Sequence, residues 1–211
     1  MKIRAKDFFS GEEKERIRRA VQSAESGTSG EVAVVLADES DRYRDAELIG
    51  ALSFSALVSL VLSVAFHYVT IWFFIPVTAI LLFPFFRLFR TLPHMKLAFL
   101  SNRRIEDAVK ERAVYAFFEK GVHKTEEHTG ILIFISLLER KVWILGDEGI
   151  HRKIRSDFWR SLVRELTDGI KSNQTSEALC RVIEKCGAEL TVHFPGRAGD
   201  KNELRDDVTC D

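Results

Sequence analysis

The chain has 211 residues, with 31 Lys and Arg against 31 Asp and Glu, so its formal net charge is zero. This length suits one domain of ordinary size. The balanced charge gives no electrostatic argument for binding nucleic acid, which favours a basic patch or stripe. We therefore expect no nucleic-acid partner. The charge is unevenly distributed, because no Asp, Glu, Lys or Arg occurs between Leu48 and Phe86.

The residues before this uncharged run predict a helix and a strand. The first residues are charged and lack an apolar core, which predicts that there is no signal peptide. Ser10 and Glu13 form the pattern of a capping box, and the apolar spacing that follows predicts a helix that ends near Gly27. The β-branched run Glu31–Ala37 predicts a strand. The polar segment Asp38–Glu47 then leads into the uncharged run.

The uncharged run predicts a transmembrane hairpin. A helix needs roughly 20 residues to cross a bilayer core, and the run from Leu48 to Phe86 is long enough for two crossings. We expect spans at Leu48–His67 and Ile71–Arg90, joined at the polar stretch 67–70. The alternative is a buried core hairpin in a soluble protein, but a core helix usually keeps a polar stripe.

The distribution of Lys and Arg predicts the orientation of this hairpin. Basic residues lie before the first span and after the second, whereas the tip has none: Arg42, Arg44, Arg87, Arg90, Lys96, Arg103 and Arg104. The positive-inside rule then predicts a multi-pass protein of the inner (cytoplasmic) membrane with both termini in the cytoplasm. The lipid bilayer is thus an expected partner. The three Cys residues are too few for a disulfide framework and favour a reducing compartment.

The second half of the chain completes an α/β pattern. It contains a helix at Asn102–Lys120, a continuous apolar strand at Gly130–Leu137 that should be central in a sheet, and a returning strand at Lys141–Leu145. A turn at 146–149 and two amphipathic helices follow, the first capped by Ser156 and the second at about 176–189. The polar segment 195–211 lacks periodicity and is interpreted as a mobile tail.

These elements predict a single mixed-sheet α/β domain with the hairpin inserted into it. One strand precedes the hairpin and two follow it, so a small sandwich forms only if both halves share one sheet. The expected parts are an N-terminal part of the domain at 1–47, the transmembrane hairpin at 48–90, the remainder of the domain at 91–194, and the tail at 195–211.

The central block resembles the TPM domain family, and in particular its membrane-embedded bacterial branch. The residues that carry the resemblance are Thr129–Ser136, Glu139–Val142, Ile144–Asp147, Gly149-Ile150, Asp157, Trp159, Phe194-Pro195 and Asn202–Leu204. The resemblance implies a TPM-like α/β sandwich. It also implies two activities described for family members, namely acid phosphatase activity and divalent-cation binding through acidic loops. The chain departs from the family at Glu126–Gly130, where many members carry an Asn-Gly turn.

Acidic residues after the predicted strands suggest a cation site. The candidate ligands are Asp38 and Asp41 after the first strand, Asp147 after the third, and Asp157 in the first turn of a helix. If those strands are neighbours, their carboxylates could converge and bind Ca²⁺ or Mg²⁺, which prefer oxygen ligands. The alternative is solvated loop charge. His123 and His128 do not have the spacing of a zinc-binding helix.

The leading functional hypothesis is a membrane-anchored binding or scaffold module on the cytoplasmic face. Glu139 and Arg140, at the predicted hairpin tip, match the family and are expected to contact a membrane or cytoplasmic protein partner. The alternative hypothesis is a metal-dependent acid-phosphatase-like hydrolase. A transporter or channel is disfavoured within one chain, because the predicted spans contain no Asp, Glu, Lys or Arg before residue 87.

Overall fold

The computed structural model describes residues 4–196 and 202–210 and divides the chain into two compact units. The first unit combines both ends of the chain, residues 1–40 and 106–211, and contains the β-sheet. The second unit, residues 41–105, is helical. The mixed α/β fold predicted from the sequence is confirmed.

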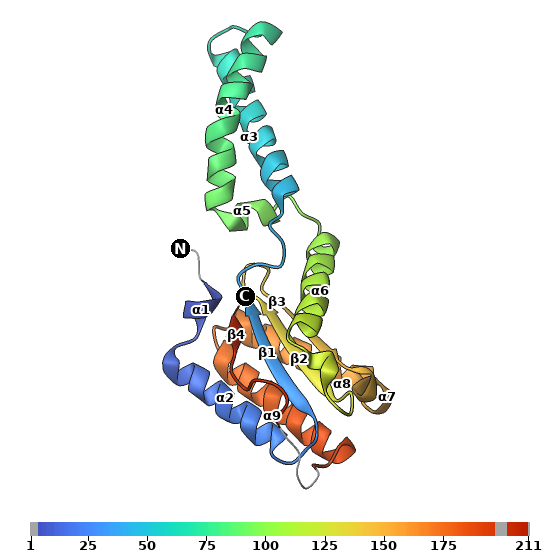
Figure 1. The fold of residues 1–211 in the computed structure, drawn as a ribbon. Coiled ribbons are helices and arrows are strands. Elements are labelled where there is room, and N and C mark those ends of the chain that lie inside the picture. The colour runs from blue at the N-terminus through green and yellow to red at the C-terminus, as the bar shows by residue number, and fades with distance from the viewer. Residues whose placement is uncertain (1–3, 197–201, 211) are drawn as a thin grey trace. The chain divides into compact units, whose positions relative to one another are not determined.

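The sheet has four strands in the order β3-β2-β1-β4 (Figure 1). β1 (Glu31–Ala37) and β2 (Gly130–Ser136) run parallel, and every residue of both strands is buried. β3 (Lys141–Gly146) forms an antiparallel hairpin with β2. The central position predicted for the apolar strand is therefore confirmed. It follows from the need to cover both faces of a strand that lacks polar alternation.

The fourth strand differs from the sequence-based prediction of a mobile tail. β4 (Thr209–Cys210) pairs parallel with β1, and Leu204 packs against one of the two cores. Glu31, the first residue of β1, accepts hydrogen bonds from the backbone N–H groups of Glu203 and Leu204 at 3.2 and 3.3 Å. A strand this short has no detectable period, so composition alone indicated only a polar segment. Residues 197–201 and 211 of the predicted tail lie outside the described residues.

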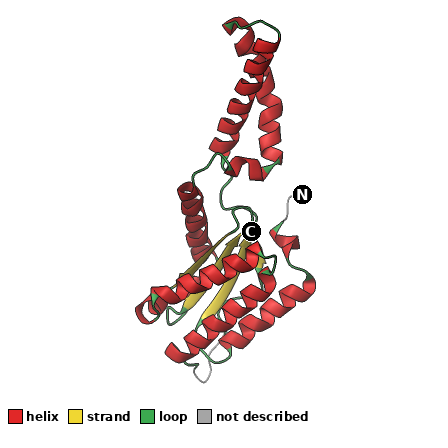
Figure 2. Cartoon of the chain, turned by 180° about the vertical axis from the view of Figure 1, so that it is seen from behind, coloured by secondary structure: helices red, strands yellow, loops and turns green. Residues whose placement is uncertain are grey.

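Helices cover the two faces of the sheet separately, as the opposite views of Figures 1 and 2 show. On one face, Val32, Val34 and Leu36 of β1 pack in a core with α2 (Gly11–Glu25), α8 (Ser156–Lys171) and α9 (Thr175–His193). On the other face, the alternate β1 residues Ala33, Val35 and Ala37 pack against α6 (Asn102–Glu119). The two-residue period of a strand thus divides its side chains between two cores.

The helix ends follow from local sequence, with two differences from the predictions. The capping box of Ser10 and Glu13 is present and α2 follows it, as predicted. The predicted turn at 146–149 instead leads into a short helix, α7 (Glu148–Lys153), because Asp147 caps its N-terminus. α8 begins at Ser156 itself, and its N-cap is Arg155. Two further short helices are α1 (Ala5–Phe8) and the 3₁₀ helix η1 (Val122–Lys124).

The second unit is a helical hairpin followed by a short helix. α3 (Arg44–Ala65) and α4 (Ile71–Thr91) pack side by side and are joined at residues 66–70, as predicted. α5 (Pro93–Leu97) follows at the end of the hairpin opposite this connection (Figure 1). Ser55, Ser59 and Ser63 of α3 are at most 2% exposed, and the Ser59 hydroxyl donates to the Phe74 carbonyl of α4 at 2.9 Å.

Candidate functional site: the corner between β2 and β3

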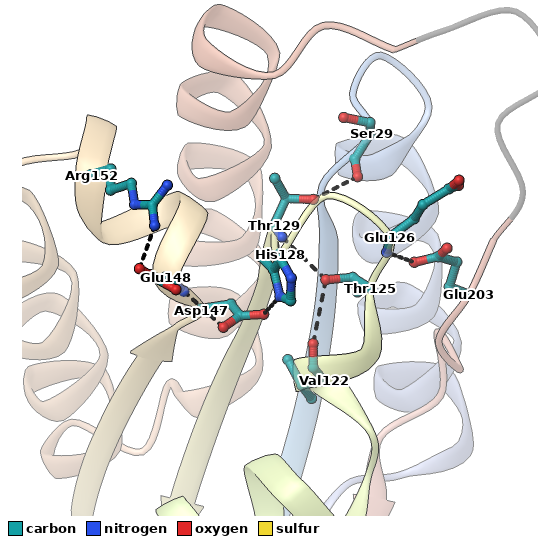
Figure 3. Close-up of polar contacts among 10 residues, drawn as sticks. All are labelled: Ser29, Val122, Thr125, Glu126, His128, Thr129, Asp147, Glu148, Arg152 and Glu203. Atoms are coloured by element: carbon teal, nitrogen blue, oxygen red, sulfur yellow. Dashed lines mark hydrogen bonds and ion pairs between the residues drawn. The ribbon is translucent and has the colours of Figure 1, made fainter.

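The loop that enters β2 is held by threonine hydroxyls (Figure 3). Thr125 is buried, and its hydroxyl accepts a hydrogen bond from the Thr129 N–H at 3.1 Å. The Thr129 hydroxyl donates to the Ser29 carbonyl, just before β1, at 2.9 Å. These bonds connect the loop to the neighbouring strand. The corner is therefore a defined surface at the N-terminal ends of the two parallel strands.

An imidazole and a carboxylate meet at this corner. His128 Nδ1 lies 3.2 Å from Asp147 Oδ2, with the imidazole 63% exposed and the carboxylate 14% exposed. Asp147 Oδ1 also accepts the Glu148 N–H at 2.7 Å, which caps α7. The Gly149 N–H donates to the His128 carbonyl, and a Cβ at Gly149 would lie 2.6 Å from that oxygen. Only glycine fits the backbone this closely.

The conformation of His128 explains the departure from the family at this turn. His128 has a φ of 55°, in the left-handed region where Asn and Gly are favoured. Here a histidine takes this conformation and its ring lies beside the Asp147 carboxylate.

The chemistry open to this pair is proton transfer. An imidazole beside a carboxylate has the groups that general acid–base catalysis uses. Among the described residues, no Ser, Thr or Cys side chain makes a hydrogen bond with His128. The nearby Ser29 hydroxyl donates to Glu127 at 2.8 Å. The corner therefore contains an imidazole–carboxylate pair, and within the described residues no nucleophilic side chain is hydrogen-bonded to the imidazole.

Two of the predicted cation ligands in the sheet unit, Asp38 and Asp147, lie far apart in the structure. Asp38 follows the C-terminal end of β1, where one carboxylate oxygen accepts the Ala5 N–H. Asp147 follows β3, which is antiparallel, and its backbone N–H donates to Gly130 at the start of β2. The two carboxylates thus lie at opposite ends of the sheet. Asp38 and Asp147 therefore do not converge, because β1 and β3 end at opposite edges of the sheet.

The remaining two carboxylates have basic partners. Asp41 belongs to the second unit and forms an ion pair with Arg104 at 2.7 Å. Asp157 is 65% exposed and forms ion pairs with Arg160 and Arg155 on the first turn of α8. Within residues 4–196 and 202–210, no group of three or more His, Cys, Asp or Glu side chains could hold a metal ion. Binding of Ca²⁺ or Mg²⁺ at any one position remains a prediction.

The two predicted partner-contact residues have different environments. Glu139 is buried, and its carboxylate accepts hydrogen bonds from the Ser40 N–H at 3.0 Å and from the Ser136 hydroxyl. It therefore holds the β2–β3 turn in place. Arg140 is exposed at the tip of that turn, with a φ of 52°. The side chain that a partner can reach is Arg140, and its contact with a partner remains a prediction.

A partly buried group of acidic residues beside β1 was not predicted. Burial, together with the nearby carboxylates of Glu31 and Asp206, raises the pKa of the Glu25 carboxyl to about 8. Glu25 accepts the Val32 N–H at 2.8 Å. Asp206 comes from the C-terminal segment and accepts from Gln22 on α2 at 2.7 Å. The signal available in the sequence was Glu31, a charged residue at the start of a buried strand.

Comparison with known proteins finds one family match. The family model of the TPM domain matches residues 93–189, just under half of the chain. The resemblance of the central block to this family is thus confirmed, whereas membership of its membrane-embedded branch remains a prediction, because α3 and α4 lie outside the match.

The chain as a whole is also similar to a solved structure. The NMR structure of the BA42 protein from the psychrophilic bacterium Bizionia argentinensis is similar, with a TM-score of 0.60 and 20% sequence identity. The alignment covers 96% of this chain and 94% of that chain. At this identity the likeness establishes the fold. No curated protein matches the chain.

Proposed function

We propose that α3 and α4 form a two-pass membrane hairpin that anchors the TPM domain to the bilayer. Both helices are long enough to cross a membrane, with mean hydropathies of 2.3 and 2.0 in their most apolar windows. Core helices of soluble proteins reach similar values but are mostly buried. Here only 28% of the α3 window and none of the α4 window is buried inside the protein.

The observation that carries this proposal is the reversed polarity of the hairpin. Its interface contains the buried hydroxyls of Ser55, Ser59 and Ser63, whereas large apolar side chains face outward. Ile80 is 73% exposed and Phe83 80% exposed. In water, each such side chain forgoes about 1.5–3 kcal/mol of burial free energy. In a bilayer, lipid covers these side chains, and small residues allow the two helices to approach closely.

Extraction and labelling of the full chain test the anchor and its orientation. We expect the protein to remain in the membrane pellet after alkaline carbonate treatment. With the native cysteines changed to serine, Tyr68→Cys at the connection should react with an impermeant maleimide in intact cells, whereas Lys171→Cys on α8 should not. Release by carbonate would overturn the anchor. Labelling only at residue 171 would overturn the orientation alone.

We further propose that the anchored TPM domain is a binding or scaffold module for a membrane or cytoplasmic protein. The support is the β2–β3 turn, where a buried network around Glu139 fixes the backbone and leaves the Arg140 side chain exposed. A rigid turn with an exposed guanidinium favours a partner that carries a carboxylate, because arginine binds carboxylates through two parallel hydrogen bonds.

Site-specific photocrosslinking tests the binding role. A photoreactive residue at position 140 should give a discrete adduct in intact cells, whereas the same residue at exposed position 171 should give none. Arg140→Ala should abolish co-purification of the crosslinked partner, and Lys171→Ala should preserve it. Equal adducts at both positions, or a partner that is retained by Arg140→Ala, would contradict the proposal.

The second candidate is a metal-dependent phosphatase, favoured by the His128–Asp147 pair. That pair offers a proton-transfer group at an open corner of the fold. This candidate predicts that the purified full chain releases phosphate from an aryl phosphate with Mg²⁺ and that His128→Gln abolishes release. Activity that is unchanged by this substitution, or by chelation, would refute it.

A further inference from the structure

The basic residues of the second unit gather at one end of the hairpin. Arg44 lies in the first turn of α3, and Arg87 and Arg90 lie in the last turns of α4. Because the two helices are joined at residues 66–70, these turns lie together at the opposite end. Arg103 follows α5 at the start of α6. All four side chains are exposed, and we call them the basic collar.

The acidic residues nearby do not neutralise the collar. Between residues 41 and 105, all of which the structure describes, the acidic residues are Asp41, Asp45 and Glu47. Asp41 forms an ion pair with Arg104 at 2.7 Å, and Glu47 is buried with Lys96 at 3.5 Å. Within the described residues, the four collar arginines form no ion pair. The end of the hairpin therefore carries an excess of exposed positive charge.

Buried contacts around Lys96 and Phe99 hold the backbone that carries the collar. Lys96 of α5 is 4% exposed, donates to the Arg42 carbonyl at 3.0 Å and lies over the Tyr43 ring at 5.7 Å. The Phe99 ring packs on Phe89 of α4 with centroids 5.5 Å apart. These contacts connect the segment before α3 to the segment after α4. The collar arginines are thus carried by packed segments at the end of the hairpin, next to its exposed apolar side chains.

We infer that the basic collar binds the phosphodiester headgroups of anionic lipids. This inference rests on the proposed membrane hairpin, because it requires the collar to lie at the level of the headgroups. Guanidinium groups bind phosphate oxygens through paired hydrogen bonds, and exposed arginines next to a span are attracted to an anionic leaflet. The exposed apolar side chains that adjoin the collar, such as Leu48 and Leu88, fit the acyl chains of the same lipids.

Spin-label measurements on the reconstituted full chain test this inference. The protein is inserted into phosphatidylcholine vesicles that contain trace spin-labelled phosphatidylglycerol or spin-labelled phosphatidylcholine, and the motionally restricted fraction of each label gives its relative association constant. We expect a preference for phosphatidylglycerol that falls by up to about fivefold for each collar cation removed at low ionic strength. Added salt should weaken the preference.

The matched variants are Arg87→Gln and Arg87→Gln/Arg90→Gln, against Arg164→Gln on α8, an exposed arginine outside the second unit. The first two should lose the preference stepwise, and Arg164→Gln should keep it. Equal association of both lipids with the unaltered chain, or equal effects of all variants, would overturn the inference. Carbonate extraction of the same vesicles is scored separately. Release there refutes the membrane anchor, whereas retention without lipid preference refutes only the collar.

Discussion

The two units of this chain differ in which side chains they bury and which they expose. In the sheet unit, apolar side chains such as Ile133 and Phe134 are fully buried, and most charged side chains are exposed or half-buried. In the hairpin unit, Ser55, Ser59 and Ser63 are buried, whereas many large apolar side chains, such as Ile80 and Phe83, are exposed. In water, burying apolar side chains is favourable, which stabilises the first arrangement. In the hydrocarbon core of a bilayer the second arrangement costs little, because lipid tails are as apolar as leucine. The difference supports the proposal that the hairpin lies in a bilayer.

The largest expected effect tests the contrast directly with two Phe→Ala substitutions. Phe134 in β2 is fully buried, so Phe134→Ala should cost about 3–5 kcal/mol of unfolding free energy. Phe83 in α4 is 80% exposed, and Phe83→Ala should change that free energy by less than about 0.5 kcal/mol. Urea unfolding of the full chain in detergent, followed by tryptophan fluorescence, measures both. Equal losses would remove the distinction between the two units.

A second test concerns the buried ion pair of the hairpin unit. The Lys96 and Glu47 side chains are 5% and 11% exposed. Lys96→Met leaves a carboxylate buried without its partner and should cost about 3–5 kcal/mol. Amide hydrogen exchange at α5 measures the loss as a lower free energy of local opening. The double change Lys96→Met/Glu47→Leu should restore most of the protection. If it restores none, the pair does more than neutralise charge.

Close helix contacts occur in both units and provide a smaller test. A Cβ at Gly187 of α9 would lie 2.5 Å from Ala24 Cβ of α2, and one at Gly50 of α3 would lie 2.4 Å from the Phe89 ring. Gly187→Ala should therefore destabilise the sheet unit by about 1–3 kcal/mol. Gly11→Ala is the control, because its Cβ would meet nothing within 4 Å. A stability unchanged at Gly187 would show that α2 and α9 can separate at little cost.

The sequence predicted the elements whose patterns are local and missed those that depend on partners. The strand Glu31–Ala37 and the capping box at Ser10 were predicted correctly, because β-branched runs and capping residues act within a few positions. β4 was missed because two residues have no period, and its pairing with β1 depends on contacts across the whole chain.

The site was less predictable than the fold for a topological reason. Asp38 and Asp147 each follow a strand in the sequence, but the direction of β3 determines whether their side chains meet. The positions of the acidic residues do not reveal that direction. The His128–Asp147 contact likewise depends on the left-handed backbone of His128. The departure from the family at this turn was visible in the sequence, although its consequence was not.

Glu25 gives the sheet unit a pH dependence that the hairpin is not expected to share. Its pKa is raised from 4.5 to about 8 in the folded protein, so the native state binds more protons than the unfolded state between these values. Stability from this group is complete below pH 4.5 and is lost as the pH rises toward 8. Urea unfolding at several pH values should show this decline, and Glu25→Gln should flatten it. An unchanged slope in the variant would assign the decline to other groups.

The smallest expected effect separates the two roles of Asp147. Its carboxylate caps α7 and contacts His128 at 3.2 Å. Asp147→Ala removes both roles and should cost about 1 kcal/mol, the usual value of an N-cap. Asp147→Asn keeps a capping oxygen but loses the charge beside the exposed imidazole, so it should cost less than half as much. Equal costs for the two substitutions would mean that the ion pair with His128, and not the cap, stabilises this corner.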